Sequence, residues 1–346
     1  MSSILEKSIK KDYGDVMFDV TKLFESDGQI IPVTLSMDIA LNGGWQEGTI
    51  GMIAGVSGSG KSTLCLVIAA SAQKMGKTVY YIDAENRLQG SLLKTIEGLD
   101  VSPEKFKVIA STADKLLMGE DYLNILVNIL THEEDCVIIL DSIAALGSET
   151  TFSAQIGESK QMLTGPKQMY EALRKACQLV RPRRHILIGI THVQSSPDMY
   201  NRNPEVGGKA WPYLSSYRIT CLSSTEIPKD DPIKTGRESK FKVFKTALGP
   251  GTGEGVFYIK HKAGYDRVSD VFKQAEELGF IAKAGAWYSA KLLSGDQKIQ
   301  GVTAFCDYLR QNPEDLNALE KEVRELVFGK ATPVKAAKEK KKKDEQ

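Results

Sequence analysis

The chain has few cysteines, and their spacing fits neither a metal site nor a disulfide framework. Its 346 residues include five cysteines, an odd number without any C-x-x-C pair: Cys65, Cys136, Cys177, Cys221 and Cys306. Most of them lie in apolar stretches, so we expect buried, reduced thiols. The set argues against a zinc protein and against a disulfide-stabilised secreted domain, and it favours a reducing, cytoplasmic compartment.

Long apolar runs and a strong excess of one charge are also missing. No apolar stretch approaches the roughly 18 residues of a membrane helix, and the charged segment 1–12 lacks the hydrophobic region of a signal peptide. The 45 basic and 44 acidic residues give a formal net charge of +1, which excludes a strongly basic protein but allows a local basic patch. We therefore expect no membrane partner and a chain that folds into one large domain or two.

A glycine-rich segment is the most informative feature that is present. It matches the P-loop pattern G-x-x-x-x-G-K-[ST] with the residues Gly55, Val56, Ser57, Gly58, Ser59, Gly60, Lys61, Ser62 and Thr63. An apolar run precedes it and a helical pattern follows it, which is the context that the motif requires. We expect the backbone N–H groups of this loop to bind nucleotide phosphates, with Lys61 on the β- and γ-phosphates and Ser62 on Mg²⁺. The loop predicts a nucleoside triphosphate ligand.

The middle of the chain alternates apolar runs with helical patterns. We expect helices at 64–75, 121–131 and 159–180, and strands at 49–54, 78–83, 106–110, 136–141 and 185–191. This alternation predicts an α/β fold, a mostly parallel twisted sheet with helices on both faces. Ligands of such sheets bind at the carboxyl ends of the strands. Turns rich in Gly, Pro and Asp then separate runs that predict an antiparallel extension, at 217–222, 241–247 and 256–259.

The two ends of the chain differ from this core. We expect an N-terminal helix at 3–11 within a lead-in and linker, a small C-terminal α/β module, and a disordered tail that carries four consecutive lysines. The corresponding boundaries are 1–42 for the helix and linker, 43–268 for the core, 269–330 for the module and 331–346 for the tail.

Three acidic residues and one histidine lie at predicted strand ends. Asp141 ends an apolar strand, the position where P-loop proteins hold the Mg²⁺ shell. Glu85 lies two residues beyond another strand end, where a carboxylate can orient and deprotonate the attacking water. His192 can donate a hydrogen bond to a γ-phosphate. Each has a structural alternative, as a turn former, a surface carboxylate or a core histidine, and Asp83 fits best as a brace of its turn.

The order of these motifs resembles that of the RecA family of homologous recombinases. Beyond the P-loop and Asp141, the chain carries Asn-Pro-Glu-Val-Gly-Gly-Lys-Ala at 203–210 and Lys-Ala-Gly-Ala-Trp-Tyr-Ser at 283–289. The second run is specific to bacterial-type RecA rather than to P-loop ATPases in general. The resemblance extends from the N-terminal helix to about residue 305. It implies a RecA-type P-loop NTPase core and an ATP-dependent recombinase that forms helical filaments on single-stranded DNA and pairs it with homologous duplex DNA.

The resemblance also implies roles for individual residues. Glu85 is the implied catalytic glutamate, Lys61 and Ser62 bind phosphate and Mg²⁺, and Asp141 belongs to the metal shell. His192 is implied to link the nucleotide to a DNA-binding loop, and ATP to lie between adjacent subunits. Two loops, at about 149–161 and 194–209, are implied to bind DNA through basic groups and closely approaching glycine backbone. Their suitable residues are Gln155, Ile156, Gly157, Tyr200, Arg202, Asn203, Gly207, Gly208 and Lys209.

The chain departs from the family pattern at several positions. His192 replaces the usual glutamine, and Leu92 occupies the position of an aromatic residue over the adenine. Lys245 supplies one of two lysines that reach ATP from the neighbouring subunit, and the second is absent. The tail is basic where bacterial RecA is acidic, so it is either a solubilising segment or an electrostatic lure for DNA. These departures point to a viral or divergent recombinase.

Two other classes of protein use the same core. A filament-forming regulator would use ATP only as a switch, and a hexameric motor would unwind DNA. Glu85 argues against the regulator, because a switch needs no carboxylate that activates water. The N-terminal helix and the Trp287-Tyr288-Ser289 run argue against the motor. The sequence therefore favours a DNA-dependent ATPase of the recombinase type, acting in recombination and DNA repair.

Overall fold

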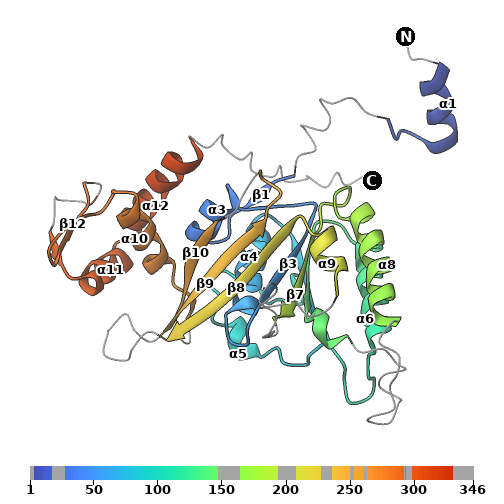
Figure 1. Ribbon diagram of the computed structural model, residues 1–346, viewed down its shortest axis with the longest axis horizontal. Coiled ribbons are helices and arrows are strands. Elements are labelled where there is room, and N and C mark those ends of the chain that lie inside the picture. The colour runs from blue at the N-terminus through green and yellow to red at the C-terminus, as the bar shows by residue number, and fades with distance from the viewer. Residues whose placement is uncertain are drawn as a thin grey trace, which may run out of the picture.

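The computed structural model describes residues 4–17, 28–146, 164–193, 208–226, 236–249, 253–260, 263–291, 293 and 298–329. Its largest element is a nine-stranded sheet with the strand order β11-β10-β9-β8-β3-β7-β6-β4-β5. The strand pairs from β8 to β5 are parallel, and those from β8 to β11 are antiparallel. The predicted fold class, a mostly parallel sheet with an antiparallel extension, is confirmed (Figure 1).

The strands agree closely with the apolar runs of the sequence. The parallel part contains β3 (Thr49–Gly55), β4 (Thr78–Asp83), β5 (Phe106–Ile109), β6 (Cys136–Asp141), β7 (Ile186–His192) and β8 (Tyr217–Glu226). The extension contains β9 (Gly236–Lys245), β10 (Glu254–Lys260) and β11 (Gly264–Tyr265). The β9 strand begins before its predicted run, because residues 236–240 are glycine, polar or charged and form no apolar run, although they pair with both β10 and β8.

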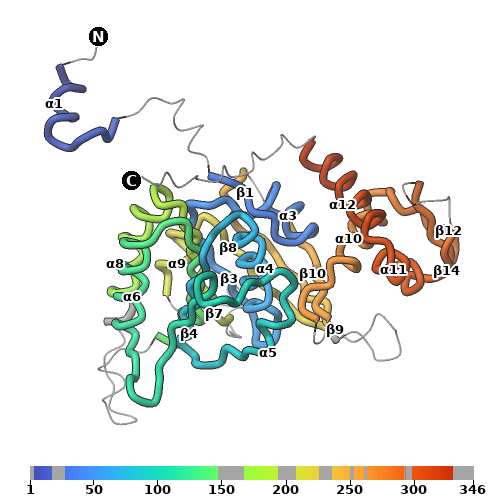
Figure 2. Tube along the Cα trace, turned by 180° about the vertical axis from the view of Figure 1, so that it is seen from behind, coloured from blue at the N-terminus to red at the C-terminus, as the bar shows by residue number. Residues whose placement is uncertain are grey.

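Helices cover both faces of the sheet. They are α4 (Lys61–Lys74), α5 (Gly90–Leu93), α6 (Gly119–His132), α8 (Thr164–Leu179) and α9 (Ala210–Leu214). Alternate residues of β4 enter two separate cores: Val79 and Tyr81 pack on the α4 side, whereas Tyr80 and Ile82 pack on the side of α6 and α8. Figure 2 shows α4 and the α6–α8 pair from behind the sheet. No helix among these residues is long and apolar enough to cross a membrane.

The lead-in segment is divided into two parts. The predicted N-terminal helix is present as α1 (Ile4–Tyr13), which stands apart from the sheet in Figure 1 and has no buried residue. After the undescribed residues 18–27, the chain forms β1 (Ile30–Ile31), α3 (Leu35–Leu41) and β2 (Trp45–Gln46). Met37 and Leu41 of α3 are fully buried in the main core. Residues 28–42 thus lie in the folded body, where the sequence pattern predicted a linker.

The C-terminal module has a hydrophobic core of its own. It consists of α10 (Arg267–Glu277), β12 (Ala282–Ala284), β13 (Trp287–Ser289), β14 (Ile299–Gln300), α11 (Val302–Gln311) and α12 (Pro313–Phe328). The rings of Phe272, Tyr288 and Phe305 pack together at its centre. Charged groups join it to α3, since Arg324 of α12 lies 2.9 Å from the buried carboxylate of Asp38.

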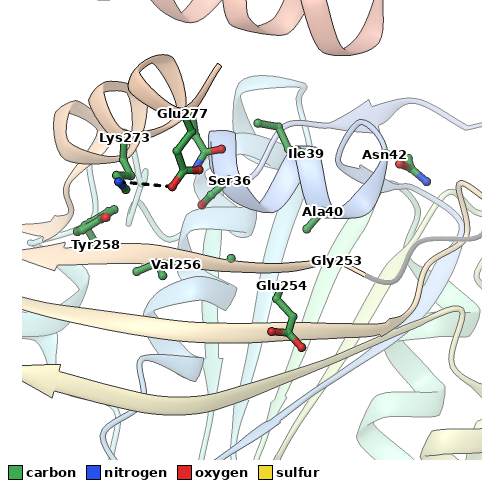
Figure 3. A pocket seen from close by; sticks show the side chains of 12 residues that line it. Ser36, Ile39, Ala40, Asn42, Gly253, Glu254, Val256, Tyr258, Lys273 and Glu277 are labelled. Atoms are coloured by element: carbon green, nitrogen blue, oxygen red, sulfur yellow. Dashed lines mark ion pairs between the residues drawn. The ribbon is translucent and has the colours of Figure 1, made fainter. Parts of the chain in front are cut away.

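A polar cavity of about 390 Å³ lies at this junction, between α3, β10 and α10. Figure 3 shows the ion pair of Lys273 and Glu277 (3.5 Å) on its α10 side and Ser36 on its α3 side. None of the residues that the sequence assigns to nucleotide binding lines this cavity. It therefore belongs to the joint between the core and the module.

Candidate active site

The predicted site residues gather at the carboxyl ends of four neighbouring strands. Gly55 at the end of β3 pairs with His192 at the end of β7, and Asp83 at the end of β4 pairs with Asp141 at the end of β6. Glu85 follows β4 directly. Because parallel strands place their carboxyl ends at one edge of the sheet, the P-loop, three carboxylates and the histidine share that edge.

The P-loop joins β3 to α4 and is braced by the antiparallel extension. Gly60 has φ +85°, and a Cβ atom there would lie 2.4 Å from Ile259 Cδ1 and 2.9 Å from Phe257 Cζ. Only glycine fits this position without strain. The buried Ser239 hydroxyl donates a hydrogen bond to the Ser59 carbonyl at 2.5 Å. The loop is therefore fixed at the start of α4, whose free N–H groups and dipole favour an anion.

Lys61 is the first residue of α4, and its ammonium group folds back over the loop. Its Nζ donates hydrogen bonds to the carbonyl oxygens of Gly55 (3.1 Å) and Val56 (2.8 Å). Burial lowers the pKa of Lys61, although the negative charge of Asp141 and other nearby groups opposes this shift. A phosphate entering the loop would offer this partly desolvated ammonium group charged acceptor oxygens, which make stronger hydrogen bonds than the two carbonyl groups do.

Asp141 holds a pair of hydroxyl groups behind the loop. Ser62 Oγ donates to Asp141 Oδ2 at 2.8 Å, and the Tyr81 hydroxyl donates to the same oxygen at 2.5 Å. Burial raises the pKa of Asp141, while these two hydrogen bonds act to lower it. A hydroxyl and a carboxylate are the hard oxygen donors that Mg²⁺ prefers, and Mg²⁺ usually completes its shell with water and substrate phosphate. The described residues hold no group of three or more His, Cys, Asp or Glu side chains placed to bind a metal ion by themselves.

Glu85 is the centre of a second polar group. Its Oε1 accepts hydrogen bonds from Ser142 Oγ (2.5 Å) and from His192 Nε2 (3.1 Å), and its Oε2 pairs with Arg87 at 3.2 Å. Partial burial acts to raise the pKa of Glu85, but these partners outweigh it and hold the pKa below its usual value. Glu85 is therefore an ionised carboxylate at neutral pH.

Sequence reasoning missed Ser142, Arg87 and Tyr81 as members of the site. The pairing of Asp83 with Asp141 brings Ser142 beside Glu85, so a correct strand register would have found it. Arg87 is exposed and follows no motif. Asp83 braces its turn, as the sequence favoured, because its carboxylate accepts from the N–H groups of Arg87 (3.2 Å) and Leu88 (2.7 Å).

The remaining predicted residues are less closely connected with this site. Leu92 lies on α5, partly buried against the main core, and Lys245 is exposed at the end of β9. Lys209 is exposed beside Gly208 at the start of α9. Seven predicted DNA-binding residues lie outside the described residues: Gln155, Ile156, Gly157, Tyr200, Arg202, Asn203 and Gly207.

Comparison with known proteins gives matches that cover the core and the module together. The family model described as RecA N-terminal domain matches residues 3–266, and the one described as RecA C-terminal domain matches residues 269–327. The chain is 32% identical over 329 residues to Protein RecA of Streptococcus pneumoniae (strain Hungary19A-6), which covers 92% of this chain and 81% of the relative. Protein RecA of Streptococcus pneumoniae strain CGSP14 gives the same values.

Proposed function

This chain belongs to the RecA family, and from that membership we propose that it is an ATP-dependent recombinase. In this proposal it forms helical filaments on single-stranded DNA, pairs that strand with homologous duplex DNA, and hydrolyses ATP to ADP and phosphate. The observation that carries the proposal is the Glu85 group, an ionised carboxylate held by Ser142 and His192 at the same sheet edge as the P-loop. A protein that only binds ATP has no use for such a base.

Hydrolysis would use the residues at this edge in separate roles. The loop N–H groups and Lys61 bind the phosphates and stabilise the charge that develops on them. Ser62 and Asp141 would hold Mg²⁺, which neutralises phosphate charge when bound. Glu85 orients the attacking water and accepts its proton. Its low pKa keeps it in the basic form, and a hydrogen bond from Ser142 fixes its direction.

DNA would act on this site through His192. The histidine ends β7 and contacts Glu85, and it begins the segment that contains the second proposed DNA loop, 194–209. A change in that loop on DNA binding would move His192 and free Glu85 for water. The family resemblance adds Gly208 and Lys209 to the proposed DNA contacts, and both precede α9, which packs on the sheet.

Assembly would use the N-terminal helix. In α1, the side chains of Ile4 and Leu5 are 91% and 66% exposed, and no residue of the helix is buried. An amphipathic helix of this kind requires a partner surface, and a neighbouring copy of the chain can supply it. A head-to-tail contact that does not close produces a filament. ATP would lie between such neighbours, with the exposed Lys245 reaching it from the adjacent subunit.

Electron microscopy of the protein with single-stranded DNA and a slowly hydrolysed ATP analogue tests this proposal. A recombinase gives helical filaments that require both DNA and nucleotide. Closed rings would instead support a hexameric motor. Filaments from a protein that binds ATP but does not hydrolyse it would support a switch-type regulator, and in both cases the recombinase proposal would fail.

A further inference from the structure

A tyrosine of the hydrophobic core turns its hydroxyl group toward the active site. Tyr81 in β4 is 1% exposed, and its ring stacks against Phe106 with 6.3 Å between the ring centres. A phenylalanine would fill the same space. Burying a phenol hydroxyl costs free energy unless it finds a partner. Here the hydroxyl donates to Asp141 Oδ2 at 2.5 Å, so the polar atom of this core residue is directed at a proposed metal-site carboxylate.

The geometry restricts the carboxylate of Asp141. Oδ2 accepts from the Tyr81 hydroxyl and, at 2.8 Å, from Ser62 Oγ. The two donors come from different elements, β4 and α4, and together they occupy one oxygen. The other oxygen, Oδ1, takes neither donor. Rotation of the carboxylate would break two charge-assisted hydrogen bonds, which are stronger than neutral ones.

We propose that Tyr81 is a positioning residue for the Mg²⁺ site, and this inference rests on the proposed ATP-binding function. Its hydroxyl, together with Ser62, fixes Asp141 through Oδ2 and leaves Oδ1 available to the hydration shell that a metal bound at Ser62 would carry. Residues that orient metal ligands from behind commonly change metal affinity about 10- to 100-fold when they are removed. Because Asp141 would act through metal-bound water, we expect the lower end of that range for Tyr81.

The neighbouring residue provides a matched control. Tyr80 is also buried, with 6% of its surface exposed, but it points to the opposite face of β4. Its hydroxyl bonds to Lys107 Nζ at 3.0 Å rather than to Asp141. Tyr80→Phe removes the same atom from the same strand without touching the proposed metal site. A general effect of losing a tyrosine hydroxyl from β4 would appear in both variants.

The experiment measures binding of ADP to the full chain while Mg²⁺ is titrated, by isothermal calorimetry, without DNA and without turnover. For Tyr81→Phe we expect the Mg²⁺ concentration at half-maximal ADP binding to rise about 10-fold. ADP affinity in EDTA should stay at the wild-type value, and Tyr80→Phe should follow the wild-type titration. In an Asp141→Ala background, Tyr81→Phe should have no further effect, because its target is gone.

A Tyr81→Phe titration that coincides with the wild type would overturn the inference while leaving the ATP site intact. An equal shift in Tyr80→Phe, or an equal loss of ADP affinity in EDTA, would assign the effect to packing of β4 and would also overturn it. If the wild type bound ADP without any influence of Mg²⁺, the proposed ATPase function would fail together with the inference. Conversely, a selective shift without DNA-stimulated hydrolysis would preserve the inference and refute the recombinase.

Discussion

Replacement of Glu85 by glutamine separates nucleotide binding from hydrolysis. Glutamine keeps the shape of the side chain, and its amide oxygen can still accept from Ser142 and His192. It cannot accept a proton from water, and it loses the 3.2 Å ion pair with Arg87. A positioned general base contributes about 10²- to 10⁴-fold to a rate, which is roughly 3–5 kcal/mol of transition-state stabilisation. We therefore expect the turnover number for ATP to fall by about 100-fold or more.

The assay is phosphate release under single-turnover conditions, with ATP binding measured separately. ATP affinity should remain within about 3-fold of the wild type, because Glu85 bonds to residues outside the P-loop. Glu97→Gln provides a control for charge, since Glu97 is an exposed glutamate that bonds to none of these groups. An unchanged turnover number in Glu85→Gln, or an equal loss in Glu97→Gln, would refute the role of Glu85 as the base.

Three further predictions follow from other parts of the molecule. Gly60→Ala adds a Cβ 2.4 Å from Ile259 at φ +85°, so strain of about 1–3 kcal/mol should weaken ATP binding about 5-fold or more; normal binding would contradict the braced loop. Burial raises the pKa of Asp38 to about 7 and that of Asp270 to about 6. Because both folded-state values exceed the unfolded ones, the stabilisation is greatest at low pH and is lost as the pH rises to about 7. The melting temperature of the wild type minus that of Asp38→Asn should therefore decrease from pH 5 to pH 8. A constant difference would show that titration of Asp38 does not change the stability of the fold. Deletion of 334–346 should weaken DNA binding mainly at moderate salt if the lysine tail attracts DNA, whereas identical salt titrations would indicate a solubilising tail.

Local patterns were sufficient to predict the sheet and the first members of the site. The apolar runs that end at Asp83 and Asp141 are the strands β4 and β6 with the same bounds. The places of the P-loop and His192 can be predicted from the same alternation of apolar runs and helical patterns. Both lie at the ends of predicted strands, and parallel strands bring their carboxyl ends to one edge of the sheet. These features depend on short stretches of chain and on a topology with few alternatives.

Long-range contacts explain what the sequence did not predict. The helix α3 is held by burial of Met37 and Leu41 and by the capping bond from Met37 N–H to Thr34 Oγ1 (3.2 Å), and its surroundings come from β10 and α10 far along the chain. Only the structure places the Tyr81 hydroxyl on Asp141. Such partners depend on strand register and side-chain direction, which a single sequence does not specify.

The central claim, that this protein recombines DNA, is tested most directly by a strand-exchange assay. Circular single-stranded DNA is mixed with the protein, ATP, Mg²⁺ and a linear duplex, and joint molecules are separated by gel electrophoresis. We predict joint molecules with a homologous duplex and none with a heterologous duplex of equal length. Filaments that form on the single strand but yield no joint molecules, or equal yields from both duplexes, would contradict the account.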